Sequence, residues 1–293
     1  MSVRTDLALE AQELDKENMS GVSISRRSGK GMSVTTLRVA TEEAARRLCK
    51  DIGTYITCEF KALTDDFTAA DSRVCAVGEL IAQLVPKDGG VLVAGIGNGD
   101  ITADALGPMA ASKVLATRHI AGETARTLGL SDLRSVCVLS PGVLGQTGLE
   151  VSELLRGVIR STRIGCVIAV DALASRRLSR LGCTVQISDT GIAPGSGIGN
   201  RRATLSEKTL GVPVIAVGVP TVVDAATLAC DLLFDESESE RARRTVMSGA
   251  YAGMIVTPRE IDLLTKRASL LIGMAINVAL QPGLSPDELF ALV

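Results

Sequence analysis

From residue 90 onward, short apolar runs alternate with longer stretches in which apolar residues recur at helical spacing. Short apolar runs between glycine, proline or polar residues are typical of buried strands, whereas a 3.6-residue spacing is typical of amphipathic helices. The apolar runs predict strands at residues 91–94, 136–139, 166–170, 185–187 and 214–219. The amphipathic stretches predict helices at residues 104–117, 149–161 and 222–233. This alternation predicts an α/β fold with a mostly parallel or mixed central sheet and helices on both faces.

The two ends of the chain add a helix and a polar segment to this pattern. Thr257, Pro258 and Glu260 provide the N-cap, the first-turn proline and the acid of a helix start. We expect that helix to run to about residue 280 and to pack on the sheet. Residues 15–30 are polar and aperiodic, so we expect an exposed segment there. A chain of 293 residues is within the range of a single large α/β domain.

Composition narrows the classes of function. The chain is 46% apolar but only 2% aromatic, and its net charge is −2, so we expect neither a basic field nor stacking platforms for nucleic acid. The seven cysteines are odd in number and form no CxxC pair, which indicates reduced core residues of a cytoplasmic protein. The N-terminal residues have no apolar signal core, and we expect no membrane span.

Two aspartates in glycine-rich frames are the candidate catalytic residues. Asp104 lies in GIGNGDITADALGP and Asp171 lies in VIAVDALASR, each after an apolar run that predicts a strand. Parallel α/β sheets place their ligands at the carboxyl ends of the strands, so the fold can bring the two carboxylates together there. One ionised and one protonated carboxyl can then activate a water molecule and donate a proton to a peptide carbonyl. The alternative is that each aspartate only caps the helix that follows it.

Other motifs supply weaker candidates. ISDTGIAPGSGIGN (187–200) contains a single Asp-Thr-Gly triplet like that of pepsin-like proteases, but the surrounding pattern is α/β. Gly195 and Gly197 in this loop can expose backbone N–H groups to an anion or a substrate backbone. Arg201 and Arg202 follow and can pair with an acidic substrate side chain, or they can be solvated arginines after a turn. His119 is the only histidine, which excludes a metal site with two histidines, and its neighbours do not resemble a catalytic triad.

Taken together, these motifs resemble the germination proteases of spore-forming bacteria, which degrade small acid-soluble spore proteins during germination. The resemblance covers nearly the whole chain and also includes VRTDLALEA, SPGVLGQTGLE and GVPVIAVGVPTVVDA. It implies an atypical aspartic endopeptidase on a phosphorylase/hydrolase-like sheet, similar in fold to the hydrogenase-maturation peptidases. The catalytic aspartates of the family fall on Asp104 and Asp171. The resemblance also implies a homotetramer, and we expect no metal and no cofactor.

The same family is made as a precursor that removes a short N-terminal peptide. Residues 5–10, Thr-Asp-Leu-Ala-Leu-Glu, resemble the substrate motif Thr-Glu-(Phe/Ile)-Ala-Ser-Glu, which is cut after its first acid. The resemblance therefore implies self-cleavage between Asp6 and Leu7, with residues 1–6 as propeptide and residues 7–293 as one peptidase domain. An inhibitory N-terminal segment can either occupy the cleft or brace a misaligned dyad. We expect an arginine, among Arg176, Arg177, Arg201 and Arg202, to bind the acid before the cut.

Two other classes of function remain open from sequence. The loop at residues 191–200 also suits a phosphate- or nucleoside-binding hydrolase or phosphorylase of the same fold. A non-catalytic family member that keeps the fold for binding is the second alternative.

Overall fold

A set of parallel strands forms one side of a single sheet. The computed structural model describes residues 5–14, 20–120, 133–195, 202–233 and 253–293. Within these ranges the parallel strands are β4 (Gly90–Ile96), β5 (Val136–Gly142), β6 (Ile164–Ser175) and β8 (Val214–Asp224). β4 pairs with β5 and β6, and β6 pairs with β8, all in parallel. β4, β6 and β8 are almost entirely buried, which explains why their sequences are continuous apolar runs.

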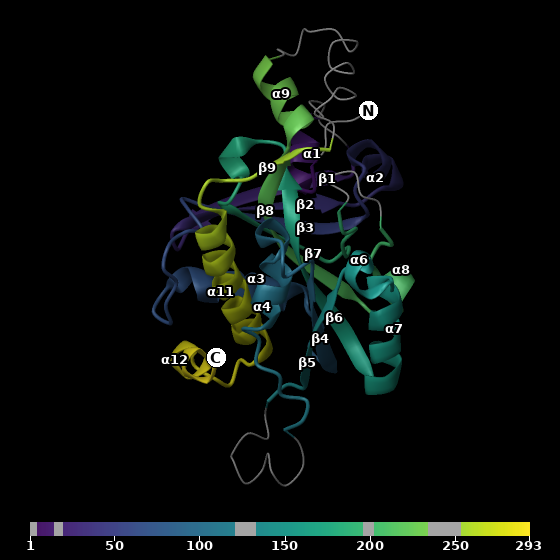
Figure 1. The fold of residues 1–293 in the computed structure, drawn as a ribbon, viewed down its shortest axis with the longest axis vertical. Coiled ribbons are helices and arrows are strands. Elements are labelled where there is room, and N and C mark those ends of the chain that lie inside the picture. The colour runs from purple at the N-terminus through teal and green to yellow at the C-terminus, as the bar shows by residue number, and fades with distance from the viewer. Residues whose placement is uncertain (1–4, 15–19, 121–132, 196–201, 234–252) are drawn as a thin grey trace.

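The remaining strands extend the sheet beyond β8 in antiparallel pairs. They are β1 (Val22–Gly29), β2 (Met32–Val39), β3 (Gly53–Phe60), β7 (Thr184–Ser188) and β9 (Ile255–Val256). Across the described residues the order is β1-β2-β3-β7-β8-β6-β4-β5, with β9 also paired to β8 (Figure 1). The sheet is therefore mixed, and the predicted α/β class with a mostly parallel or mixed sheet is confirmed.

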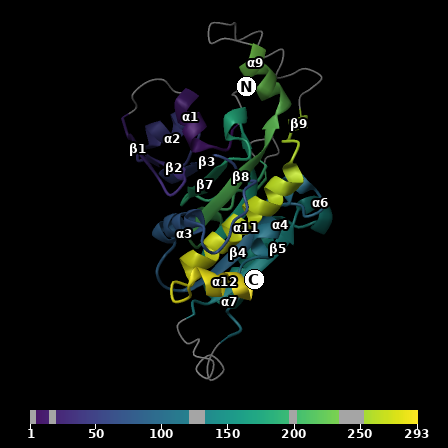
Figure 2. The same cartoon turned by 90° about the vertical axis from the view of Figure 1, so that its left-hand side faces the viewer.

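Helices cover both faces of the sheet (Figures 1 and 2). One face carries α3 (Ser72–Leu84), α4 (Leu106–Ala111), α11 (Ile261–Leu280) and α12 (Pro286–Leu292), whose apolar side chains share one core cluster with alternate strand residues. The other face carries α7 (Val151–Thr162) and α8 (Glu207–Leu210), which pack on the opposite side chains of β4 and β6. A third cluster lies where α1 (Ala8–Leu14) and α2 (Glu42–Leu48) cover β2 and β3. The short elements are α6 (Leu144–Thr147), α9 (Ala225–Leu233) and the 3-10 turns η1 (Thr102–Asp104) and η2 (Leu178–Arg180).

Three predicted helices have different bounds in the structure. α4 ends at Ala111 because the side chain of Asn277 in α11 replaces further helical bonds: it accepts from the Leu115 N–H at 2.8 Å and donates to the Lys113 carbonyl at 2.8 Å. Residues 222–224 continue β8 because β9 pairs with that end of the strand. The same pairing moves the start of α11 further along the chain. The helix begins at Ile261 rather than just after residue 257, because the chain must first turn away from β9.

The segment expected to be exposed forms a strand where it is described. Residues 22–29 are almost entirely exposed, as expected, but they pair with β2 as the edge strand β1. Residues 15–19 lie outside the described residues.

α11 combines length with an apolar sequence. Among the described helices it is the one that could cross a membrane by length and composition, and 67% of the qualifying window is buried inside the structure. Its buried side chains belong to the same core cluster as those of α3 and α4. Packing in the core accounts for its apolar sequence.

Candidate active site

Asp104 and Asp171 line one cavity at the carboxyl ends of β4, β6 and β8. The cavity has a volume of about 220 Å³, and its wall also includes Gly97, Thr221 and Arg202. The fold thus brings together two carboxylates that are 67 positions apart in the sequence, 171 minus 104. The capping alternative is wrong for both residues. The N-cap of α4 is Ala105, without a side-chain bond, and Asp171 lies inside β6, which continues to Ser175.

Asp104 is held at the end of a tight loop. Its Oδ2 accepts the backbone N–H of Asn98 at 2.6 Å. Gly97 has a φ of +121°, and a Cβ there would lie 2.1 Å from the Asp104 carbonyl oxygen, so this approach requires glycine. The hydroxyl of Thr221 in β8 donates to the Ala103 carbonyl at 2.7 Å, which fixes η1 to the sheet. Asp104 is therefore positioned by the loop and by β8 together.

Asp171 lies in a more enclosed place. It sits on β6 between β4 and β8, opposite Gly218, and only 4% of its surface is exposed. Its Oδ1 accepts the N–H of the next residue, Ala172, at 2.9 Å. A buried carboxylate with so few donors is strongly disfavoured in the ionised form.

The surroundings of the two carboxyl groups shift their pKa values to different extents. Burial raises the pKa of Asp171 well above its ordinary value, and the negative charges of Asp104 and Asp6 raise it further. Burial also raises the pKa of Asp104, but the Asn98 N–H and the charge of Arg202 oppose that rise. The two groups interact, so they titrate as a pair. When the pair holds one proton, these effects favour its location on Asp171 and leave Asp104 ionised.

The N-terminal segment enters the same cavity, because Asp6 is also one of its lining residues. The Asp6 N–H donates to the Ala174 carbonyl at 2.9 Å, and the Ala174 N–H donates to Asp6 Oδ2 at 2.8 Å. The Asp6 carbonyl oxygen accepts from Lys50 Nζ at 2.9 Å and from Gln186 Nε2 at 3.0 Å. Asp6 thus lies between the aspartate cavity and a neighbouring cavity lined by Lys50 and Gln186. The N-terminal segment therefore lies in the cleft, which is the first of the two arrangements considered from sequence.

Neither Lys50 nor Gln186 was identified from the sequence. Lys50 follows α2 in an unremarkable polar stretch, and nothing in that stretch connects it to Asp6. Gln186 did carry a signal, since it is a polar residue inside the apolar strand β7. Burial lowers the pKa of Lys50, whereas the neighbouring charge of Asp6 raises it.

The other predicted residues have different locations. Gly195 and Arg202 line the aspartate cavity, whereas Gly197 and Arg201 lie outside the described residues. Arg176 contributes its backbone N–H to Glu10 at 2.7 Å rather than lining the cavity. Asp189, the acid of the Asp-Thr-Gly triplet, accepts the Thr54 N–H at 2.7 Å and does not line the aspartate cavity, which speaks against the pepsin-like reading.

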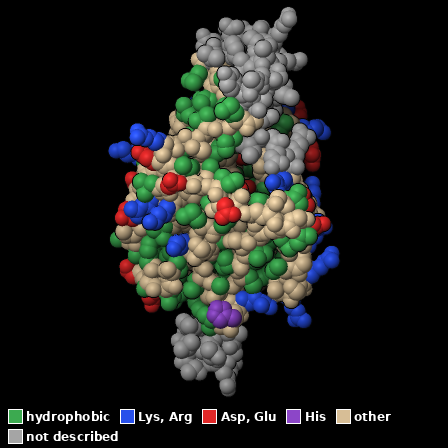
Figure 3. Space-filling model, viewed as in Figure 1, with side chains coloured by type: hydrophobic (Ala, Val, Ile, Leu, Met, Phe, Trp, Pro, Cys, Tyr) green, Lys and Arg blue, Asp and Glu red, His purple; other side chains and the backbone are tan. Residues whose placement is uncertain are grey.

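Among the described residues, few side chains lie where they could bind a metal ion or act as a reactive thiol. His119 is exposed on the surface (Figure 3) and does not line the aspartate cavity. In the described part of the chain, no three His, Cys, Asp or Glu side chains are grouped so that they could hold a metal ion. All seven cysteines lie in the described residues and none is joined to another in a disulfide; Cys58, Cys166 and Cys230 are buried.

Comparison with known proteins gives consistent matches. The model of the family described as germination protease matches residues 3–235. The germination protease of Caldanaerobacter subterraneus subsp. tengcongensis is 42% identical, covering 100% of this chain and 98% of the relative. That of Clostridium tetani is 38% identical, covering 99% and 98%, and that of Bacillus velezensis is 33% identical, covering 98% and 95%.

A solved structure was also matched. It is the NiFe hydrogenase maturation protease HycI from Thermococcus kodakarensis, with 17% identity and a TM-score of 0.37, covering 67% of this chain and 98% of that chain. The family assignment rests on the sequence matches, which extend over the full chain at 33–42% identity. The chain belongs to the germination protease family.

Proposed function

We propose that this protein is a self-processing endopeptidase that degrades small acid-soluble spore proteins during germination, in the cytoplasm of the spore. Family membership supports a peptidase of spore germination. The observation that carries the finer proposal is the position of Asp6, which lines the cavity that contains Asp104 and Asp171. The residue before the bond expected to be cut, Asp6–Leu7, therefore lies in the same cavity as the candidate catalytic pair.

The mechanism follows from the different protonation of the two aspartates. Asp104, ionised, takes a proton from water, and the resulting hydroxide attacks the carbonyl carbon of Asp6. As the bond breaks, Asp171 gives its proton to the leaving nitrogen of Leu7. The dyad ends with one proton, now on Asp104, and exchange of that proton with Asp171 restores the starting state. One water molecule is consumed, and a carboxyl and an amine are formed.

Lys50 and Gln186 have a direct part in this scheme. Their Nζ and Nε2 atoms lie 2.9 and 3.0 Å from the Asp6 carbonyl oxygen, which becomes negatively charged in the tetrahedral intermediate. Two donors at such distances are the geometry of an oxyanion hole, and one of them is an ammonium group. The donors lie on the side of the neighbouring cavity, so the aspartates are left to act on water and on the leaving group.

The test is the intact mass of the purified protein before and after mild acid incubation. We expect the wild type to lose residues 1–6, and we expect Asp104→Asn and Asp171→Asn to keep them. Asp88→Asn, at an exposed aspartate before β4, is the control and should be processed like the wild type. An intact N-terminus in a folded wild type would favour a non-catalytic binding role. Cleavage in both dyad variants would leave a peptidase but remove this pair from its mechanism.

A further inference from the structure

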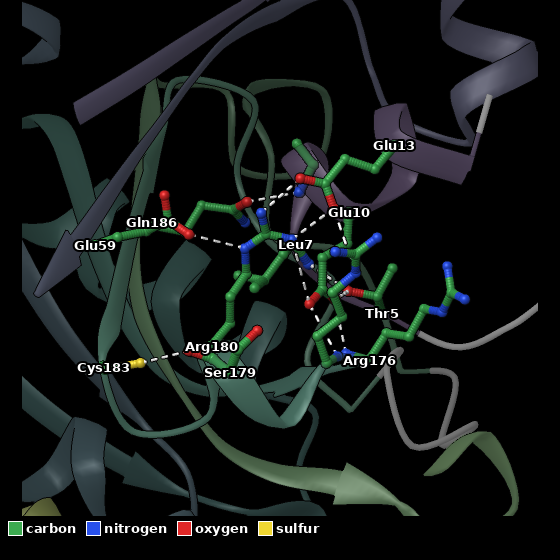
Figure 4. Close-up of polar contacts among 12 residues, drawn as sticks. Thr5, Leu7, Glu10, Glu13, Glu59, Arg176, Ser179, Arg180, Cys183 and Gln186 are labelled. Carbon is green, nitrogen blue, oxygen red and sulfur yellow. Dashed lines mark hydrogen bonds and ion pairs between the residues drawn. The ribbon is translucent and has the colours of Figure 1, made fainter. Parts of the chain in front are cut away.

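The backbone nitrogen of Leu7 lies one hydroxyl group away from a buried carboxylate. It donates to Thr5 Oγ1 at 3.1 Å, and the same hydroxyl donates to Oε2 of Glu10 (Figure 4). Leu7 and Glu10 are both 0% exposed. Thr5 precedes the bond expected to be cut, and Leu7 follows it. Self-cleavage therefore removes the bridging hydroxyl and leaves the nitrogen of Leu7 beside the carboxylate of Glu10.

The carboxylate of Glu10 is held in place by groups other than Thr5. Its Oε2 accepts the backbone N–H of Arg176 at 2.7 Å, and its Oε1 accepts that of Arg177 at 3.0 Å. A terminal nitrogen of Arg180 lies 3.7 Å from Oε1. The carboxylate thus keeps its position when Thr5 leaves, but Oε2 loses one donor. A buried carboxylate that loses a donor favours a replacement, above all a charged one.

The cation nearest to Glu10 is shared with other acids. Arg180 lies 2.6 Å from Glu13 and 3.0 Å from Glu59, and both distances are shorter than its distance to Glu10. The other charged side chains that act on Glu10 and Arg180 are those of Lys50 and Arg177, from the end of α2 and the start of η2. The Nζ of Lys50 donates to a carbonyl of the N-terminal segment. The surroundings of Glu10 therefore suit one more cation.

The residues after the cut are anchored independently of residues 1–6. The Ala8 N–H donates to Gln186 Oε1 at 2.7 Å, and the Ala11 N–H donates to the Leu7 carbonyl oxygen at 3.2 Å. Ala8 also packs in the core cluster with β2 and β3. These contacts hold Leu7 near its present position after processing, so its free nitrogen stays close to Glu10.

The end of β6 provides a second acceptor. The hydroxyl of Ser175 is buried and has no hydrogen-bond partner among the described residues. Ser175 lies between Ala174 and Arg176, whose backbone N–H groups bind Asp6 and Glu10. Buried hydroxyls are nearly always hydrogen-bonded in native structures, so an unpaired one next to the N-terminal segment indicates a partner that arrives later. An ammonium group has three protons to donate and suits this position.

We propose that Glu10 and Ser175 form a binding site, the ammonium site, for the α-ammonium group that self-cleavage creates on Leu7. This inference rests on the proposed function. The cut turns an amide N–H into a primary amine, which takes up one further proton from solvent. The ammonium replaces the hydroxyl of Thr5 at Glu10 Oε2, and its other protons are available to Ser175. The processed N-terminus thus stays docked beside the aspartate cavity instead of being released.

The first experiment measures the pKa of the Leu7 amine. A fusion partner placed directly before Leu7 and removed by an added protease gives the processed chain, whether or not the protein cuts itself. All members of the three core clusters follow residue 7, so this chain keeps its whole core. The rate of acetylation by acetic anhydride from pH 6 to 11, followed by the mass of the N-terminal peptide, gives the pKa. A free α-amino group has a pKa of about 7.7–8.0, and we expect a value at least one unit higher.

Two variants assign the cause of that rise. Glu10→Gln should lower the pKa of the amine by at least one unit. Glu13→Gln is the matched control, because Glu13 makes its bonds to Arg180, and it should lower the pKa by less than 0.3 unit. An ordinary pKa in the folded wild-type chain, or equal effects of the two variants, would overturn the ammonium site. The intact mass of the full-length chain reports self-cleavage separately, so a failure of the proposed function is recognised on its own.

The second experiment moves the ammonium group and leaves Glu10 unchanged. One glycine added before Leu7 restores an amide there and displaces the charge by one residue. Because the ion pair raises the folded-state pKa of the amine, its stabilising effect is present below the unfolded pKa and is lost as pH rises through the folded pKa. We expect the chain that begins at Leu7 to have a Tm at least 3 °C higher than the extended chain at pH 7, and the difference to vanish at pH 10.5.

The same comparison in the Glu10→Gln background isolates the ion pair. Without the carboxylate, the added glycine should change the Tm by less than 1 °C, as expected when two groups act through each other. Equal Tm values of the two wild-type chains at pH 7 would overturn the proposal. A difference that persists at pH 10.5 or in Glu10→Gln would do the same, because it would show that the glycine acts only through its bulk.

Discussion

At the scale of single residues, the two aspartates are placed for different tasks by their surroundings. Asp104 belongs to a loop and receives an N–H bond of 2.6 Å that stabilises its charge. Asp171 is 4% exposed inside a strand, where burial and two neighbouring negative charges favour its neutral form. Two identical side chains thus acquire unlike proton affinities, which is the usual basis for dividing base and acid roles in a carboxyl pair.

Asp171→Asn should therefore stabilise the protein at neutral pH. The folded-state pKa of Asp171 is raised, so between its unfolded and folded pKa values the native state binds more protons and stability falls as pH rises. Asparagine removes that penalty, and we expect the Tm to rise by several degrees at pH 7.5, since about 1 kcal/mol moves the Tm of a domain this large by about 2 °C. Thermal unfolding from pH 3.5 to 8 checks the effect.

The pH dependence identifies the cause of that stabilisation. Below the ordinary pKa of aspartate, Asp171 is protonated in both states, so the gain from Asp171→Asn should vanish there. Asp88→Asn, at an exposed aspartate, should show no such pH-dependent gain. A gain that persists unchanged at low pH would contradict a raised pKa and indicate better packing instead.

The sequence predicted the aspartates but not their partners, for a physical reason. Asp104 and Asp171 follow apolar strands, and parallel strands deliver their carboxyl ends to one edge. The contacts of Lys50, Gln186 and Glu10 instead join positions that are 44, 180 and 166 residues apart. Such contacts depend on the way the N-terminal segment lies across the finished sheet, which no local pattern encodes.

At the scale of secondary-structure elements, a close approach between α4 and the sheet positions the loop of Asp104. A Cβ on Gly107 in α4 would lie 2.2 Å from the Ile96 carbonyl oxygen and 2.4 Å from that of Val170. Both obstacles are backbone atoms of β4 and β6, so they cannot move aside as a flexible side chain can. The absence of a side chain at residue 107 thus sets the height of η1 and α4 above the strands.

Gly107→Ala should therefore displace α4 and disturb catalysis. Overpacking of this kind costs typically about 1–3 kcal/mol, and we expect a loss of that size together with a larger relative loss of peptidase activity. Gly157→Ala in α7 is the matched control, because a Cβ there meets nothing within 4 Å. It should stabilise the helix by about 0.5–1 kcal/mol and leave activity unchanged. Urea unfolding and peptide hydrolysis measure both effects, and similar behaviour of the two variants would contradict the close approach.

How well each strand could be predicted from the sequence depended on how deeply the strand is buried. β4, β6 and β8 are buried on both faces, so their apolar runs were easily predicted. β1 is almost entirely exposed and carries serines and arginines, so it has no such pattern, although it pairs along its full length with β2. β2 and β3 also escaped prediction, because threonine and other polar residues interrupt their apolar positions.

At the scale of the whole molecule, the N-terminal segment is part of the fold rather than an appendage. Leu7, Ala8 and Leu9 are 0–2% exposed, and Ala8 joins the cluster that covers β2 and β3. The segment reaches the cavity of its own chain and bonds there to three distant parts of it, at Lys50, Ala174 and Gln186. No second chain is needed to bring Asp6 to Asp104 and Asp171.

Self-cleavage should consequently be intramolecular and first order. We expect the half-time of processing, followed by intact mass, to stay constant over a hundredfold range of protein concentration, since the bond is already held at its own cavity. The family resemblance implies a homotetramer, in which a neighbouring subunit could also give first-order kinetics, so a mixing experiment is the decisive control. A mass-tagged Asp104→Asn chain, refolded together with the wild type, should keep its N-terminus while the wild-type chains lose theirs. Processing of the tagged chain, or a rate proportional to concentration, would show that one chain cuts another and that the intramolecular contact serves only to inhibit.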